Sequence, residues 1–153
     1  IENVSFEALR ADTDLLTDAI SAAVRVKADI VERDEHETGD RRKLNLGHTL
    51  AHAIEKCTNR LNHGEAVAVG TALIADASVK LGVLAAEDRD RIAGVLKKLG
   101  FDLTPPVDVK RLLKEVDKDK KNEDGMLRIV VPVGIGDCDV RRMSHDEFAA
   151  LFA

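Results

Sequence analysis

Three of the chain's five histidines fall within the segment from His48 to His63. On a helix, residues four apart lie one above the other, so His48 and His52 are expected to project from the same side, with Glu55 one turn further along. A His-x-x-x-His pair on a helix suits a divalent metal such as zinc, which binds neutral imidazole nitrogens. His63, across a short turn, could complete the cluster. This density favours a metal site over the alternative of polar histidines that are hydrogen-bonded to backbone or water.

A charge-dense segment, residues 33–43, precedes the histidine helix. Arg41, Arg42 and Asn45 then arrive at the N-terminal end of that helix, where free backbone N–H groups and the helix dipole favour an anion. A phosphate or carboxylate could bind there, although an ordinary solvated loop would have the same composition. Further upstream, Lys27 is flanked by apolar residues. Its ammonium is expected to extend to solvent unless a ligand recruits it.

Helical periodicity predicts the elements that must hold these residues. The histidine helix has an apolar side opposite its histidines, formed by Leu46, Leu50, Ala53, Ile54 and Cys57. Further helices are expected at residues 12–32, 65–81, 86–99 and 107–116. The helix at 65–81 is apolar nearly all round and is therefore expected to be central. We expect the helices between residues 12 and 100 to supply one contiguous apolar core.

Capping residues and breakers mark where these helices begin and end. Asp12 or Thr13 can cap the first helix, and Gly82 and Gly100 follow the helices at 65–81 and 86–99. The Pro105-Pro106 pair breaks the chain before the helix at 107–116.

The C-terminal region is predicted to form a hairpin and a last helix. Residues 127–133 and 137–142 have the pattern of two short strands around Gly134-Ile-Gly136. Ser144 to Glu147 has the pattern of a capping box, which should begin a helix running through Leu151 and give His145 a structural role. The expected fold is mainly α, a multi-helix bundle-like domain with a small β-hairpin near the C-terminus.

Composition restricts the class of protein. A chain of 153 residues has the length of one domain, and 44% hydrophobic residues with only 3% aromatic ones require a core of Ala, Val, Leu and Ile. A net charge of −5 argues against a general nucleic-acid binder. Two cysteines make no disulfide framework, so a reducing cytoplasm is the simplest setting. The sequence shows neither a signal peptide nor an apolar run of membrane-spanning length.

Several motifs, in a fixed order, carry a family resemblance. They are Lys27, Asp34-Glu35-x-Glu37-x-Gly39-x-Arg41, Leu44-Asn45-Leu46-Gly47-His48-Thr49-x-x-His52-Ala53-Ile54-Glu55, His63-Gly64-Glu65-Ala66-Val67, and Asp119-Lys120-Lys121-Asn122. In this order they resemble the C-terminal, mainly helical domain of 3-dehydroquinate synthase, and the resemblance covers nearly all of residues 1–153. Two positions depart from the family pattern, Ala51 where glycine is common and Asp40 where an apolar residue is common.

The resemblance implies an activity and its cofactors. The family is a lyase of the shikimate pathway, in aromatic amino acid biosynthesis. It converts 3-deoxy-D-arabino-heptulosonate 7-phosphate to 3-dehydroquinate and phosphate, using NAD and zinc or cobalt. By resemblance, His48 and His63 are the metal ligands and His52 faces the substrate and transfers protons, in place of the His48–His52 pair that the spacing alone suggests. Substrate contacts are implied for Lys27, Arg41, Asn45, His52 and one of Lys120 and Lys121, of which Lys27, Asn45 and His52 are the expected catalytic residues.

The same resemblance implies that part of the enzyme lies outside this chain. The third metal ligand, a Glu, and the NAD-binding α/β domain are expected N-terminal to it, so we expect no NAD-binding residues here and no activity from this chain alone. The complete enzyme is expected to be a homodimer that binds neither nucleic acid nor membrane. The alternatives are a related sugar-phosphate cyclase of the 2-deoxy-scyllo-inosose synthase type and a non-catalytic, metal-binding helical domain.

Overall fold

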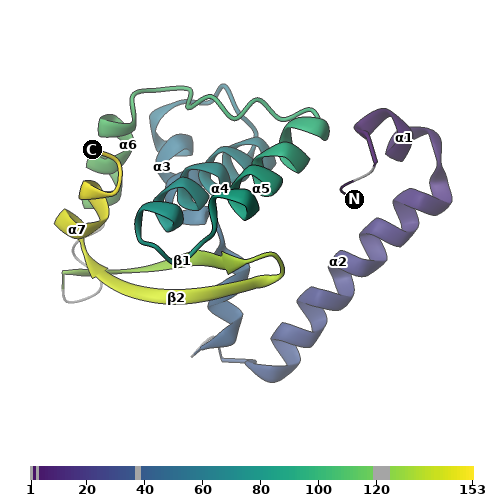
Figure 1. Cartoon of the computed structure of the whole chain (residues 1–153), viewed down its shortest axis with the longest axis horizontal. Helices are drawn as coiled ribbons and strands as arrows, with labels where there is room; N and C mark the ends of the chain where they lie inside the picture. The colour runs from purple at the N-terminus through teal and green to yellow at the C-terminus, as the bar shows by residue number, and fades with distance from the viewer. Residues whose placement is uncertain (1, 3, 37–38, 119–124) are drawn as a thin grey trace.

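The computed structural model describes residues 2, 4–36, 39–118 and 125–153 of the chain. Its elements, in order, are α1 (Phe6–Ala11), α2 (Thr13–Arg33), the 3-10 helix η1 (Asp40–Asn45), α3 (His48–Cys57), α4 (His63–Lys80), α5 (Ala86–Lys98), α6 (Val109–Asp117), β1 (Met126–Gly134), β2 (Asp137–Ser144) and α7 (His145–Ala150). In Figure 1, α3 to α7 and the hairpin form a body, and α2 runs away from it as an arm with α1 at its far end. The predicted fold class, mainly α with a C-terminal hairpin, is confirmed.

The core lies where α3 packs on α4, with α6, α7 and one face of the hairpin around them. The fully buried side chains include Leu50, Ile54, Val69, Ile74, Leu112, Ile129, Val131 and Phe148. Gly70 of α4 lets the two central helices approach, because a Cβ at this position would overlap the carbonyl oxygen of Gly47. The predicted central role of the 65–81 helix is therefore confirmed, and its small residues serve close packing.

Local signals mark where the helices begin and end, as the sequence predicts. Asp12 caps α2 by accepting from the backbone N–H groups of Asp14 and Leu15, and Ser144 forms a capping box with Glu147 at α7. Gly82 and Gly100 follow α4 and α5 with φ of 70° and 91°, a left-handed conformation that favours glycine. The charge-dense segment at residues 33–43, expected to be a loop that is either solvated or part of an anion site, differs, because its second half winds into η1.

The hairpin is antiparallel, and its two faces differ in environment. Ile129 and Val131 of β1, with Met143 of β2, are buried against the helices. The opposite face carries the cross-strand pairs Arg128–Arg142 and Val130–Val140. Since η1 contacts both strands, this second face is partly covered by the segment that leads into α3.

The prediction that the first long helix belongs to the core is wrong. No residue of α2 is buried, and its main contacts are with α1 and η1. Its large apolar side chains are 39–60% exposed at Leu16, Ile20, Val24 and Val26. Amphipathic spacing shows that a helix has an apolar face, but it does not show which element covers that face.

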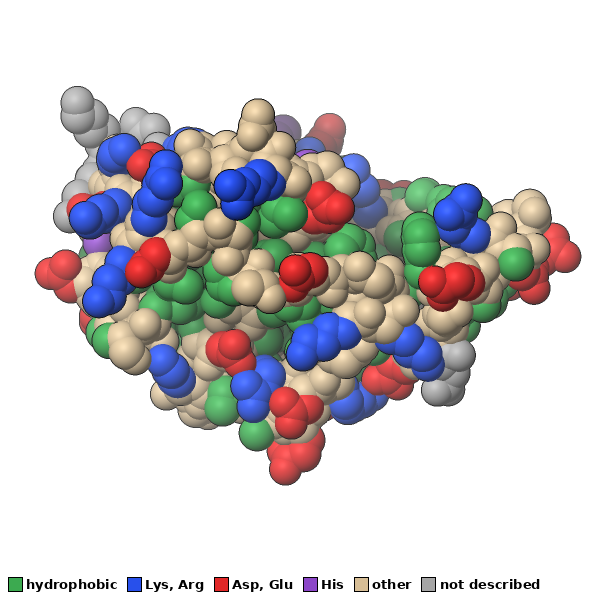
Figure 2. Space-filling view, turned by 90° about the horizontal axis from the view of Figure 1, so that it is seen from above, with side chains coloured by type: hydrophobic (Ala, Val, Ile, Leu, Met, Phe, Trp, Pro, Cys, Tyr) green, Lys and Arg blue, Asp and Glu red, His purple; other side chains and the backbone are tan. Residues whose placement is uncertain are grey.

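The surface carries charges of both signs. On the face seen in Figure 2, basic and acidic side chains are interspersed, and apolar side chains show between them over the body and the arm. None of the helices in the described residues combines the length and the apolar character that crossing a membrane requires.

Candidate metal and substrate site

The site is built at the start of α3, where the chain turns sharply at Gly47. This residue has φ of 76° and is the N-cap of α3. A Cβ here would lie only 2.5 Å from Thr71 Oγ1 and 2.9 Å from the Val67 carbonyl oxygen, both on α4. Glycine is therefore required at this position for two reasons, its backbone conformation and its close contact with α4. The turn places His48, the first residue of α3, beside the N-terminal end of α4.

The three histidines of the predicted cluster do come together. The ring centroids of His48 and His63 are 5.3 Å apart, those of His48 and His52 are 5.7 Å apart, and those of His52 and His63 are 6.3 Å apart. With Zn–N bonds of ~2.0–2.1 Å, two imidazoles on one tetrahedral ion have centroids about 5 Å apart. The His48–His63 pair is closest to that separation, although the two residues lie on different helices.

Hydrogen bonds orient both rings of this pair. The Nδ1–H of His48 donates to the Leu46 carbonyl oxygen at 3.1 Å, and the Nδ1–H of His63 donates to Glu55 Oε1 at 2.9 Å. Each bond leaves the proton on Nδ1 and the lone pair on Nε2, which is the arrangement of a metal-binding histidine with an outer-shell partner. Among the described residues, no hydrogen bond holds the ring of exposed His52.

These residues fit part of a metal site. Two open Nε2 atoms supply two ligands, whereas a catalytic zinc usually has three from protein and one open position. Within the part of the chain that the structure describes, no group of three or more His, Cys, Asp or Glu side chains is placed to hold a metal ion. Glu55 is engaged with His63 and orients it. The donor set therefore fits a metal whose remaining protein ligand comes from elsewhere.

The predicted substrate residues are less completely assembled. Asn45 is exposed at the end of η1, shortly before His48 in the chain, and Lys27 is exposed on the α2 arm. Arg41 is held within its own loop, since its Nη1 donates to the Glu35 carbonyl oxygen at 2.7 Å. Gly47 offers no side-chain cap to α3. The backbone N–H groups of the first turn, where an anion was predicted to bind, are therefore not occupied by a capping side chain. Lys120 and Lys121 lie outside the described residues.

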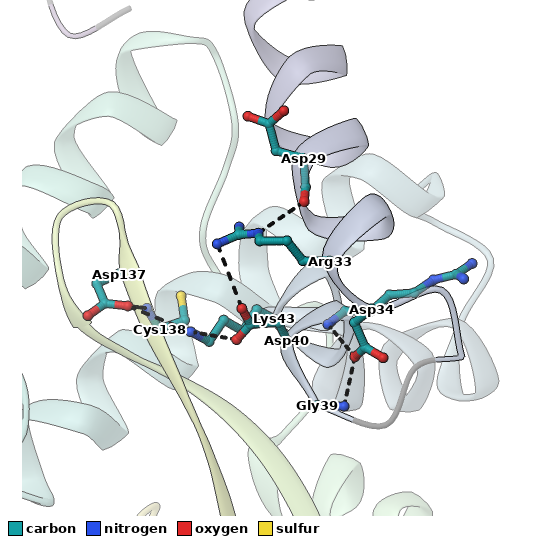
Figure 3. Close-up of polar contacts among 9 residues, drawn as sticks. Asp29, Arg33, Asp34, Gly39, Asp40, Lys43, Asp137 and Cys138 are labelled. Atoms are coloured by element: carbon teal, nitrogen blue, oxygen red, sulfur yellow. Dashed lines mark hydrogen bonds and ion pairs between the residues drawn. The ribbon is translucent and has the colours of Figure 1, made fainter.

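Asp34 organises the loop that carries Arg41. Its Oδ2 accepts from the backbone N–H of Gly39 at 2.7 Å and from that of Arg41 at 3.0 Å (Figure 3). A carboxylate bonding backbone N–H groups in this way stabilises a turn. Asp34 belongs to one of the motifs that carry the family resemblance, but its role in this turn was not predicted from the sequence. The spacing of an Asp before a glycine-containing loop was the available signal.

A second set of charges joins η1 to the α2 arm and to the hairpin turn. Lys43 Nζ lies 3.1 Å from Asp40 Oδ1 and 4.0 Å from Asp137 Oδ1, and Arg33 Nη1 lies 3.8 Å from Asp40 Oδ2 (Figure 3). The hydrogen bond and the charge of Asp40 raise the pKa of Lys43. Burial, reinforced by Asp137, raises the pKa of the neighbouring Cys138 thiol. Asp40 is thus a contact between elements.

Comparisons with known proteins agree with the motifs. The family model of the 3-dehydroquinate synthase C-terminal region matches residues 1–122. The 3-dehydroquinate synthase of Ruegeria sp. is 45% identical, over 82% of this chain and 36% of its own length. That of Pelobacter propionicus is 38% identical, over 99% of this chain and 43% of its own length. The chain therefore spans less than half the length of these curated relatives.

Solved structures of other enzymes share the fold. A 2-deoxy-scyllo-inosose synthase, in complex with carbaglucose-6-phosphate, NAD+ and Co2+, matches with a TM-score of 0.74 and 21% identity, over 86% of this chain and 39% of that one. The 2-epi-5-epi-valiolone synthase of Streptomyces hygroscopicus, with NAD+ and Zn2+ bound, matches with a TM-score of 0.78 and 23% identity, over 95% of this chain and 41% of that one. Because the family model covers most of the chain, the resemblance predicted from the motifs is confirmed, and this chain belongs to the 3-dehydroquinate synthase family, of which it carries the C-terminal region.

Proposed function

We propose that this chain is the metal- and substrate-binding half of a 3-dehydroquinate synthase. The reaction is the conversion of 3-deoxy-D-arabino-heptulosonate 7-phosphate to 3-dehydroquinate and phosphate, a lyase step of the shikimate pathway. The observation that carries the proposal is the His48–His63 pair, with centroids 5.3 Å apart and both Nδ1 atoms engaged. The high identity to named 3-dehydroquinate synthases supports the choice of reaction.

His48 and His63 would hold a divalent ion, zinc or cobalt. When bound, the ion would supply Lewis-acid chemistry and NAD would supply reversible hydride transfer. Glu55 and the Leu46 carbonyl keep the two imidazoles in the tautomer that exposes Nε2, so the pair needs little reorganisation on binding. Both ions are proposed because one of the solved structures with this fold carries Co2+ and another carries Zn2+.

His52 has a different role in this proposal. It lies on the same side of α3 as His48 and is exposed, so its ring can reach a ligand in front of the metal pair. Because no described residue fixes its tautomer, it can take up a proton on one nitrogen and release one from the other. We assign proton transfer to His52.

The anionic groups of the substrate require cations and amides. We assign them to Lys27, Arg41 and Asn45, and to one of Lys120 and Lys121. Arg41 would have to exchange its bond to the Glu35 carbonyl for a substrate oxygen. A guanidinium gains more from a carboxylate or phosphate than from a neutral carbonyl, because both partners are charged.

The rest of the enzyme completes this half. We propose that an NAD-binding α/β domain and a third metal ligand, a Glu, precede this segment in the full-length protein. The relatives, which are more than twice as long, leave room for such a domain. Homodimer formation and a cytoplasmic setting belong to the same proposal.

Phosphate release from the full-length enzyme tests the proposal. The enzyme should release phosphate from 3-deoxy-D-arabino-heptulosonate 7-phosphate in the presence of NAD and metal, and should be much slower on other phosphorylated sugars. A reversed preference would favour the second candidate, a related sugar-phosphate cyclase, which the shared fold supports. No release from any phosphorylated sugar, with metal bound, would favour the non-catalytic metal-binding domain.

A further inference from the structure

The hairpin places two arginines side by side. In the β1–β2 register, Arg128 lies directly opposite Arg142. Strand side chains alternate between faces, and the neighbours Ile129 and Met143 are buried, so both arginines point away from the core. Directly opposed like charges destabilise a strand pair. An anion bound between the two guanidinium groups would offset that repulsion.

The two arginines line a hollow of about 430 Å³ between the hairpin and η1. Arg42 and Lys43 of η1 line it as well, so four cationic side chains face two carboxylates, Asp40 and Asp139. Both carboxylates already have partners, since Asp40 lies 3.1 Å from Lys43 and Asp139 lies 3.2 Å from Arg141. Among the described residues that line the hollow, cations therefore outnumber carboxylates, although the net charge of the chain is −5.

We propose that this hollow, the hairpin hollow, is a binding site for the phosphate group of a small molecule. Guanidinium groups form forked, charge-assisted hydrogen bonds to phosphate oxygens, and three arginines converge here from three elements, η1, β1 and β2. Within the described residues, the Arg142 guanidinium has no hydrogen-bond or ion-pair partner, so a ligand would displace none from it. The volume lies within the range of small-ligand sites and exceeds what one phosphate fills.

The hairpin hollow is distinct from the histidine cluster. Its lining consists of Gly39, Asp40, Arg42, Lys43, Arg128, Asp139, Val140 and Arg142. Neither the three histidines nor Arg41 and Asn45 belong to it. A ligand there would tie η1 to the hairpin, and η1 leads directly into the start of α3. The proposal does not depend on the reaction proposed above.

Calorimetric titration of the 153-residue chain tests the proposal, with inorganic phosphate and glucose 6-phosphate as probes. We expect both to bind, and we expect binding to weaken as salt is added. Tighter binding of glucose 6-phosphate would identify a phosphorylated metabolite as the occupant, and equal binding would identify free phosphate. In the double variant R128Q/R142Q, affinity should fall about tenfold for each arginine lost, because each loses charge-assisted hydrogen bonds.

R25Q is the matched control, since Arg25 is an exposed arginine of α2 outside the hairpin hollow. It should leave the affinity unchanged. Folding of the variants is checked by thermal unfolding without anions, where R142Q should unfold at the same temperature as the parent or higher, because like-charge repulsion is relieved. Absence of binding to the parent chain would overturn the proposal. Equal binding by the parent and by a folded R128Q/R142Q would also overturn it, since the anion would then lie elsewhere.

Discussion

Replacing the three clustered histidines one at a time separates metal ligands from a proton carrier. His48→Ala and His63→Ala each remove one of two open Nε2 atoms, and a single imidazole remains. The loss of affinity for Zn²⁺ or Co²⁺ should exceed the roughly 10–100-fold that follows loss of an outer-shell partner. His52→Ala should leave the affinity within about twofold, because the His48–His63 pair, at 5.3 Å, stays intact.

Two measurements on these variants decide the assignment. Metal affinity is obtained by titration with Co²⁺ and read from its absorption bands, with His36→Ala as a control because His36 is an exposed histidine outside the cluster. In the full-length enzyme, His52→Ala should retain metal while activity falls by roughly 10²–10⁴-fold, as for a general acid–base group. If His52→Ala loses metal as fully as His48→Ala, the ligands are instead the helical His-x-x-x-His pair, and the argument from oriented rings is refuted.

Four further expectations follow from the structure. Glu55→Ala removes the acceptor of His63 Nδ1–H and should weaken metal binding about 10–100-fold by the same titration, and an unchanged affinity would show that this bond does not orient the ring. Gly70→Ala places a Cβ against the Gly47 carbonyl, so it should destabilise the chain by about 1–3 kcal/mol in denaturant unfolding, and a neutral effect would contradict the close α3–α4 contact. The capping hydrogen bonds from Ser144 lower the pKa of Glu147, so the stability that Glu147 contributes is present at neutral pH and is lost as pH falls through the lowered pKa. Glu147→Gln should therefore reduce the fall of the unfolding temperature at acid pH. Identical pH profiles for the variant and the parent would contradict this role of Glu147. The chain alone should show a helix-dominated circular dichroism spectrum and one cooperative thermal transition, yet release no phosphate with NAD and metal, and turnover by this chain would mean that the NAD site is misplaced.

Local signals in the sequence were sufficient for most of the secondary structure. Helix caps, helix-ending glycines and strand alternation act over a few residues, and each therefore leaves a pattern that is visible in the chain. The capping box at Ser144 and the ends of α4 and α5 before Gly82 and Gly100 were predicted in this way and are confirmed. The shared side of His48 and His52 also follows from helical spacing alone.

Tertiary structure decided how the site can work. The Leu46 carbonyl and the Glu55 carboxylate determine which imidazole nitrogens stay open, and no periodicity reports such contacts. The close approach of His48 and His63 depends on the α3–α4 crossing, which packing of Gly47 against Thr71 sets.

The same limit explains why the sequence did not show that α2 lies outside the core, and why it did not reveal the hairpin hollow. The apolar stripe of α2 was visible in the sequence, but its exposure depends on where the arm lies relative to the body. The pairing of Arg128 with Arg142 arises from strand register, and their approach to η1 arises from the fold. Periodicity shows which side chains share a face of one element, whereas contacts between distant segments depend on how the elements pack, and that packing is determined only in the folded chain.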